Sequence, residues 1–253
     1  MSVLRIRGVE LGGGSVKIAV PLVGRTREAL LEAAGALTDV PADLVEWRAD
    51  CFEDLFDEAA RGETLRALRE ALGGRPLLFT LRTAREGGMA APDAAQYADV
   101  LLSAARSGCA DLIDVELSAG EAAVRPLIDG VHAAGALVVG SRHDFDATPP
   151  ESDMVALLRE AQELGADVPK LAVMARSDAD TLSLLSASLT FRTRWADRPF
   201  ITIAMGPHGV LSRIACALSG SCLSFGTAGA SSAPGQLPAA ELRALLDAAA
   251  PGK

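Results

Sequence analysis

The stretch Leu112–Gly140, LIDVELSAGEAAVRPLIDGVHAAGALVVG, contains one complete structural repeat of this chain. It begins with the apolar run Leu112–Val115, which is typical of a buried strand, and it ends with a second run of the same kind. Between them, Ser118 and Glu121 form an S-x-x-E pattern that predicts the start of a helix, and Gly135 suits the end of that helix. The repeat therefore predicts a strand, a helix and a second strand parallel to the first.

The same alternation of apolar runs and helical patterns extends along the chain. Eight strands alternating with helices in about 250 residues favour an α/β fold, a (β/α)8 TIM barrel, although an open doubly wound sheet has the same local pattern. No linker or low-complexity tract interrupts the alternation, so we expect residues 1–253 to form a single domain. The expected strands are Ile18–Leu22, Leu44–Trp47, Leu77–Leu81, Leu112–Val115, Leu137–Gly140, Val168–Val173, Phe200–Met205 and Cys222–Phe225.

Two further features concern the ends of elements. The N-terminal segment LRIRGVELGGGSVKIAV (residues 4–20) is a candidate β-hairpin, with its turn expected at residues 12–14, which are all glycine. Gly108 and Gly165 suit the ends of two more helices.

The composition limits the classes of partner. A net charge of −9 argues against nucleic acid or an anionic membrane as the main partner. The chain lacks the roughly 18 unbroken apolar residues of a membrane helix and the apolar core of a signal peptide, so a cytoplasmic location is expected. The four cysteines form no C-x-x-C pair and are expected to be reduced, and no metal site or cofactor is expected.

Lysine is rare in this chain, because only Lys17, Lys170 and Lys253 stand among its 24 lysine and arginine residues. Lys170 lies in ADVPKLAVMA (residues 166–175), an apolar run that reads as a buried strand. A buried lysine can lose its proton and act as a nucleophile, whereas arginine stays protonated. The alternative is a lysine that reaches from a strand end to pair with a carboxylate.

Polar residues gather at the ends of the predicted strands, where the chemistry of such barrels takes place. Each of these charges alone is ordinary on a barrel surface, but together they describe a cationic and hydrogen-bonding cup around Lys170. His143 follows a strand directly and is well placed for proton transfer, whereas His132 and His208 are expected to lie on the surface and in a loop. A lysine nucleophile beside a histidine base suits chemistry through an iminium. The cup consists of Glu46, Arg48, Asp50, Arg82, Glu86, Asp114, Glu116 and His143.

Several segments together resemble the signature segments of type I 3-dehydroquinate dehydratases. They are, in order, EWRAD (46–50), TLRTAREGG (80–88), SRHDF (141–145), ADVPKLAVM (166–174), AMGPHGVLSRI (204–214) and SSAPGQL (231–237). The resemblance implies a barrel with an N-terminal hairpin that closes its bottom. It also implies the dehydration of 3-dehydroquinate to 3-dehydroshikimate, a step of the shikimate pathway, by a homodimer without a cofactor.

The resemblance also implies roles for ten residues. Lys170 is similar to the lysine that forms a Schiff base with the substrate's C3 ketone, and His143 to the base that takes a C2 proton. Glu86 matches the acid that orients this histidine. The groups expected to bind substrate are Glu46, Arg48 and Arg82 at its hydroxyls, Arg213 at its carboxylate, Ser232 and Gln236 in the loop that closes over the carboxylate, and Met205 beside the lysine.

One departure and two rival functions stand beside this interpretation. Pro21 occupies a position where some members of the family have serine, so a hydroxyl contact to substrate is expected to be absent. A class I (Schiff-base) aldolase acting on a phosphorylated sugar would also use a lysine on the sixth strand. A non-catalytic ligand-binding homologue should have lost the lysine or the histidine, and this chain retains both.

Overall fold

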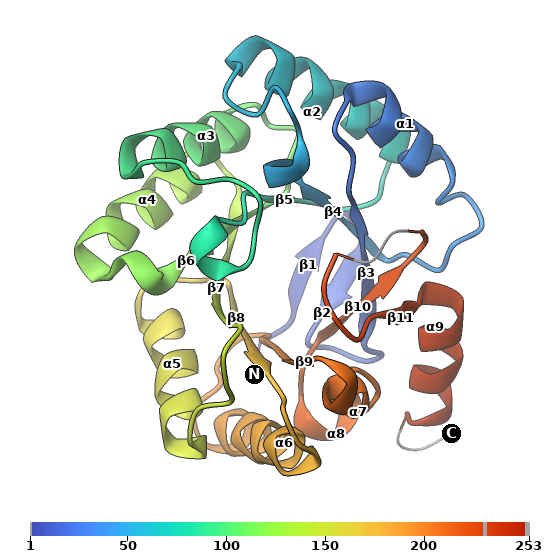
Figure 1. The fold of residues 1–253 in the computed structure, drawn as a ribbon, viewed down its shortest axis with the longest axis vertical. Coiled ribbons are helices and arrows are strands. Elements are labelled where there is room, and N and C mark those ends of the chain that lie inside the picture. Colours follow the sequence, from blue (N-terminus) through green and yellow to red (C-terminus); the bar gives the residue numbers. More distant parts are fainter. Residues whose placement is uncertain (1, 230–231, 251–253) are drawn as a thin grey trace.

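The computed structural model describes residues 2–229 and 232–250, and these form a barrel of parallel strands surrounded by helices (Figure 1). The eight barrel strands pair in the order β10, β3, β4, β5, β6, β7, β8 and β9. The two ends of this series meet where the Cys222 N–H donates to the Phe200 carbonyl oxygen (2.9 Å). The predicted (β/α)8 barrel is therefore confirmed. The strands are β3 (Lys17–Leu22), β4 (Leu44–Arg48), β5 (Leu77–Thr80), β6 (Leu112–Glu116), β7 (Leu137–Asp144), β8 (Val168–Met174), β9 (Ile201–Met205) and β10 (Leu223–Thr227), with the short β11 (Leu237–Pro238) beside β10.

The helices lie around the strands and cover their outer face (Figure 1). The long helices follow the barrel strands, and the short helices α7 and α8 share the connection from β9 to β10. Among the described residues, every helix is too short or too polar to cross a membrane. The helices are α1 (Arg27–Gly35), α2 (Glu58–Leu72), α3 (Ala94–Arg106), α4 (Glu121–Ala133), α5 (Glu151–Glu163), α6 (Asp178–Arg194), α7 (Val210–Ile214), α8 (Cys216–Ser219) and α9 (Ala239–Ala248), with the 3₁₀ turns η1 (Ala49–Cys51), η2 (Ala84–Glu86), η3 (Leu117–Ala119) and η4 (Pro207–Gly209).

Side chains alternate along each strand between the outer face, which packs against the helices, and the inner face of the barrel. On β4, Val45 and Trp47 pack outward against the helices, whereas Leu44 belongs to the apolar cluster inside the barrel. The residues that follow on the inner face of the strands are polar, as Glu46 and Asp114 illustrate. The barrel interior is thus apolar towards the amino ends of the strands and charged towards their carboxyl ends.

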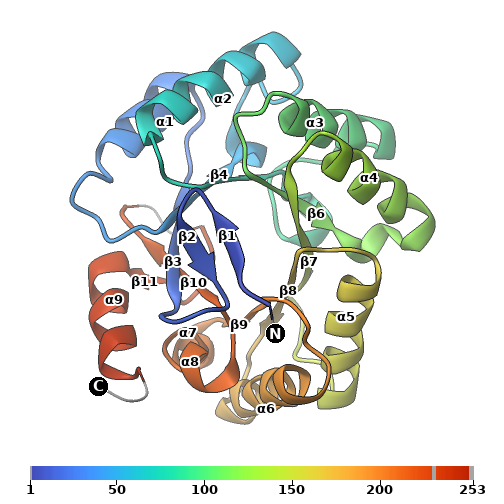
Figure 2. The same ribbon diagram turned by 180° about the vertical axis from the view of Figure 1, so that it is seen from behind.

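The N-terminal hairpin closes the apolar end of the barrel, as expected (Figure 2). It consists of β1 (Leu4–Ile6) and β2 (Val9–Leu11), and Ile6 and Leu11 belong to the inner apolar cluster. The expected position of its turn is wrong. The chain reverses at Arg7 and Gly8, which both have positive φ (45° and 86°), and not at residues 12–14.

The helix signals of the central repeat were partly correct. Gly135 has φ 84° and directly follows the end of α4, and Gly108 and Gly165 have the same left-handed conformation after α3 and α5. The S-x-x-E capping interpretation is wrong. The cap position of α4 is Gly120, with φ 83° and no side-chain cap, while Ser118 lies in the preceding turn η3.

Candidate active site

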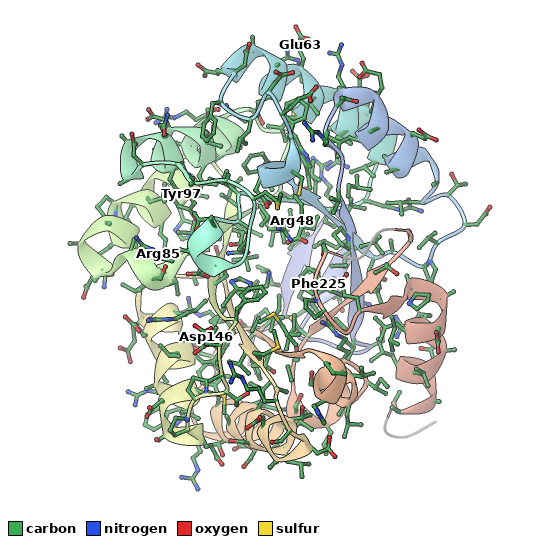
Figure 3. All side chains as sticks on the ribbon, viewed as in Figure 1. Arg48, Glu63, Arg85, Tyr97, Asp146 and Phe225 are labelled. Atoms are coloured by element: carbon green, nitrogen blue, oxygen red, sulfur yellow. The ribbon has the colours of Figure 1, made fainter. Side chains whose placement is uncertain are left out.

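A pocket of about 160 Å³ opens at the carboxyl ends of the barrel strands. All ten residues expected at a substrate site line this pocket, although they come from segments spread over most of the chain. Two residues of the pocket lining, Arg48 and Phe225, are labelled in Figure 3. The ten are Glu46, Arg48, Arg82, Glu86, His143, Lys170, Met205, Arg213, Ser232 and Gln236.

Lys170 lies near the centre of β8, with its side chain inside the barrel and only 6% of the residue exposed. Its Nζ is 3.4 Å from the Asp114 carboxylate and 4.8 Å from the centre of the Phe225 ring. The amine is therefore buried, as predicted. It lines the pocket, and it also has a carboxylate partner.

His143 lies beside Lys170 on the neighbouring strand. In the register of β7 and β8, His143 lies opposite Ala172, which is two residues beyond Lys170. The side chains of His143 and Lys170 therefore both point into the barrel, two residues apart along the strands. Glu86 Oε2 lies 2.8 Å from His143 Nδ1 and also accepts a hydrogen bond from the His143 backbone N–H (3.0 Å). With the proton on Nδ1, the imidazole presents an unprotonated Nε2 to the pocket.

Two opposite pKa shifts define this pair. Burial and the nearby positive charges of Arg82 and Lys170 hold the pKa of His143 well below its usual value, so the imidazole is a neutral base at physiological pH. Burial and repulsion by Glu116 raise the pKa of Glu86 to about 7, although the Ser118 hydroxyl and Arg82 act in the opposite direction. Glu86 therefore changes its charge near neutral pH, whereas His143 stays neutral there.

The loop that carries Glu86 is shaped by a close backbone approach. A Cβ atom on Gly88 would lie 1.9 Å from the Arg82 carbonyl oxygen, so only glycine fits there. Asp50 holds the same loop, because its carboxylate accepts from the Met89 N–H (3.0 Å).

Arg82 is the centre of an ionic network. Its guanidinium lies 2.8 Å from Asp114, 2.9 Å from Glu116 and 3.7 Å from Glu86. Although burial opposes the charge, these carboxylates raise the pKa of Arg82 above its ordinary value. Arg82 and Lys170 in turn lower the pKa of Asp114 against the effect of burial, so Asp114 and Arg82 form a stable ion pair.

Arg48 and Glu46 belong to β4, which lies across the barrel from the strand β8 that carries Lys170. Arg48 forms a bidentate ion pair with Asp50 (2.8 Å for each contact) and donates to the Ser232 carbonyl oxygen (3.2 Å). The Thr80 hydroxyl donates to Glu46 Oε1 (2.9 Å). These contacts fix the direction of both side chains before any ligand arrives.

Arg213 differs from the other cations of the pocket, because no carboxylate of the described residues lies against it. Only 2% of the residue is exposed, its Nη2 donates to the Pro234 carbonyl oxygen (2.9 Å), and Nε and Nη1 are buried without a hydrogen-bond partner within residues 2–229 and 232–250. Burial lowers the pKa of this arginine to about 10. A buried guanidinium with two free donors is a site for an anion, above all a carboxylate.

The loop after β10 covers Arg213. Ser232 and Gln236 bond to each other within it, since the Gln236 amide donates to the Ser232 hydroxyl (3.0 Å) and accepts from its backbone N–H (2.9 Å). Met205 ends β9 and contributes an apolar wall to the pocket.

Two residues of the site were missed by the sequence analysis. The Ser141 hydroxyl donates to Asp114 (2.6 Å) and accepts from Arg82 (3.1 Å), and Phe225 packs beside the Lys170 amine. Ser141 stands two residues before His143 on the same strand face, so the period of two could have identified it.

The remaining candidates lie outside the pocket. His132 pairs with Asp167 and His208 with Asp178 (2.8 Å each), in agreement with their predicted places on the surface and in a loop. Pro21 is buried and is not part of the pocket lining. In the described part of the chain, no cluster of three histidine, cysteine or acidic side chains could hold a metal ion.

Comparison with known proteins gives a consistent result. Residues 18–252 match the family model "Type I 3-dehydroquinase". The chain is 43% identical over 242 residues to the 3-dehydroquinate dehydratase of Klebsiella pneumoniae subsp. pneumoniae, with 96% of both chains covered, and 42% identical over 247 residues to that of Bacillus subtilis, with 98% of this chain and 97% of the other covered. A crystal structure of the type I 3-dehydroquinate dehydratase from Clostridium difficile, with covalently modified comenic acid, superposes with a TM-score of 0.94 at 37% identity, covering 98% of this chain and 97% of the other. This chain therefore belongs to the Type I 3-dehydroquinase family.

Proposed function

We propose that this protein converts 3-dehydroquinate to 3-dehydroshikimate and water, and that it does so through a Schiff base at Lys170. The observation that carries the proposal is the joint presence, in one pocket, of a buried lysine, a histidine on the neighbouring strand and a buried arginine that has two donors without a partner among the described residues. The names of the relatives, which are 3-dehydroquinate dehydratases, support the same substrate.

The first step forms the covalent bond. After the Lys170 ammonium gives a proton to solvent, its free amine attacks the C3 ketone to form a carbinolamine. Protonation of the carbinolamine hydroxyl then expels it as water and leaves an iminium. The positive iminium nitrogen acidifies the neighbouring C2–H bond. Asp114, 3.4 Å from Nζ, supports this positive charge as it develops.

His143 then performs the elimination. Its free Nε2 takes the C2 proton, and the electrons of that C–H bond form the double bond between C1 and C2 as the C1 hydroxyl leaves. The imidazolium returns its proton to this hydroxyl, which departs as water. Glu86 keeps the proton on Nδ1 and stabilises the transient imidazolium. Water finally hydrolyses the iminium and releases Lys170.

The other residues of the pocket bind and orient the substrate. Arg213 takes the carboxylate with its two free donors, beneath the loop that contains Ser232 and Gln236. Glu46, Arg48 and Arg82 bind the hydroxyls, since their directions are fixed by Thr80, Asp50 and the acids around Arg82. Met205 limits the space beside the lysine.

The decisive experiment follows product formation from 3-dehydroquinate by the ultraviolet absorbance of the enone. Borohydride added during turnover should reduce the iminium, and the intact protein should gain one substrate-derived adduct at Lys170. An enzyme that produces enone but gives no adduct would not use this covalent route. An enzyme that cleaves a phosphorylated sugar instead would have the rival aldolase activity.

We further propose that the whole chain folds as one domain and assembles as a cytoplasmic homodimer. Four exposed leucines support a second copy of the chain as partner, because helix α6 presents Leu182 and Leu189 next to Leu211 and Leu218 of the adjoining helices α7 and α8. Four free cysteines fit a reducing compartment. Leu189→Glu should shift the mass measured by light scattering from two chains to one, and an unchanged mass would move the interface elsewhere.

A further inference from the structure

A second cavity lies between α3 and α4, and its volume of about 310 Å³ exceeds that of the active-site pocket. We call it the α3–α4 cleft. Arg85 and Tyr97, which both line it, lie on this side of the barrel (Figure 3). A volume near 300 Å³ is at the lower end of the range of small-molecule sites.

The walls of the cleft suit an apolar molecule. Its lining includes the side chains of Ala94, Ala98, Val124 and Leu127 and the ring of Tyr97. Burial and the charge of Glu116 raise the pKa of Tyr97 well above its usual value, so the phenol stays neutral. An aromatic ring or a branched aliphatic chain would replace water against these surfaces.

The charges of the cleft favour an anionic end on that molecule. Its two acids already have partners, since Asp93 caps α3 and Glu116 is bound by Arg82 and the Thr83 hydroxyl. The exposed Arg85 guanidinium forms no ion pair or hydrogen bond with any described residue. The amino end of α4, whose cap position Gly120 provides no side-chain cap, lies at the same cleft, where Ala119 and Ala123 line it.

The cleft also touches the active-site network directly. One oxygen of Glu116 accepts from Arg82 (2.9 Å) and from the Thr83 N–H (2.8 Å), while the other accepts from the Thr83 hydroxyl (2.6 Å). Thr83 and Glu116 both line the cleft, whereas Arg82 lines the active site. Ser118, which does not cap α4, lines the cleft too, and its hydroxyl lowers the pKa of Glu86 against the effect of burial.

We propose that the α3–α4 cleft binds a small carboxylate with an aromatic or branched aliphatic body, and that occupancy of the cleft alters turnover through Thr83 and Glu116. The binding part is independent of the proposed dehydratase function, and the coupling part rests on it.

A single tyrosine in the chain makes the binding test specific. Protein labelled with 3-fluorotyrosine should give one ¹⁹F resonance, from Tyr97, and titration with 3-phenylpropanoate should shift it saturably with a Kd on the order of 1 mM or tighter. Arg85→Ala should weaken this binding roughly tenfold, and the uncharged 3-phenylpropanamide should show a similar loss.

Two control variants separate the cleft from other sites. Arg194→Ala removes an exposed arginine of α6 and should leave the titration unchanged. Arg213→Ala removes the free guanidinium of the active site and should also leave the Tyr97 shift unchanged, since that resonance reports on the cleft. The binding proposal would be overturned if Arg213→Ala abolished the Tyr97 shift or if Arg85→Ala left it intact. It would also be overturned if the shift depended on protein concentration alone.

The coupling is tested by steady-state kinetics with 3-dehydroquinate. Saturating 3-phenylpropanoate should change kcat at least twofold in the wild type and not in Arg85→Ala, whereas simple competition at the active site would change KM alone. A constant kcat with the cleft occupied would refute the coupling. Failure of the dehydratase assay itself would leave the ¹⁹F result standing.

Discussion

Replacing Arg213 by methionine should weaken substrate binding strongly and yet make the free protein more stable. Methionine has a similar length and fills much of the same space, but it carries no charge and no donors. The two effects have opposite signs because the guanidinium is buried and, among the residues that the structure describes, its one hydrogen bond is to the Pro234 carbonyl oxygen.

The magnitudes follow from the free donors of the guanidinium. Two charge-assisted hydrogen bonds to a carboxylate contribute about 1.5–3 kcal/mol each, which corresponds to an increase of KM by roughly 10²- to 10⁴-fold when both are lost. Replacing a poorly compensated buried charge by an apolar side chain stabilises proteins by about 1–4 kcal/mol, and the lost bond to Pro234 offsets about 1 kcal/mol of this. A net gain near 1 kcal/mol would raise the Tm by about 2–4 °C.

The assay combines steady-state kinetics with thermal unfolding in the absence of substrate. Arg61→Met is the matched control. Arg61 lies in α2, outside the pocket, and is as buried as Arg213. It differs in its partners, because it donates to the Leu55 carbonyl oxygen and to the Ser103 hydroxyl (2.6 Å each). The Arg61→Met change should lower the Tm and leave KM unchanged. An Arg213→Met protein with a lowered Tm and an unaltered KM would refute the reasoning.

Three further predictions concern the chemistry. Lys170→Ala should abolish borohydride trapping as judged by intact-protein mass, and trapping that persists would place the nucleophile elsewhere. His143→Ala should still be trapped by borohydride but should lose roughly 10²- to 10⁴-fold in kcat, so unchanged turnover would remove it from the role of base. In the wild type, the Glu86 carboxylate is present above pH 7 and is lost by protonation below it, so kcat/KM should fall as pH decreases through about 7. Glu86→Gln keeps a hydrogen-bond acceptor that does not titrate, and a pH profile identical to that of the wild type would contradict this assignment.

The sequence predicted the barrel, and the ten expected residues line one pocket within it, because both results depend on the alternation of side chains along strands. Asp114 and Glu116 on one strand, like Ser141 and His143 on the next, are two residues apart, so they share the inner face once the sheet closes. The sequence could not predict which of these side chains pair with one another. Arg82 follows β5 but pairs with Asp114 and Glu116 of β6, and such contacts between strands depend on the closed sheet.

The errors arose where a local pattern had more than one solution. Ser118 and Glu121 have the spacing of a capping box, which would require the helix to begin at residue 119. Gly120 instead adopts φ 83° and occupies the cap position, so α4 begins at Glu121 and Ser118 stays in η3. In the hairpin, the run of three glycines was the more obvious turn signal. The chain instead turns at Arg7 and Gly8, where the bond from Arg7 Nε to Asp111 Oδ1 (2.5 Å) fastens the turn to the barrel.

The hairpin beneath the barrel also determines how molecules travel. With Ile6 and Leu11 filling the amino-terminal end, the pocket has its opening at the opposite end, around the loops that follow the strands. In the part of the chain that the structure describes, substrate, product and the water that the reaction releases or consumes then pass through the same opening. Product must therefore leave before the next substrate can enter, and product release, as well as bond breaking, can limit the turnover rate.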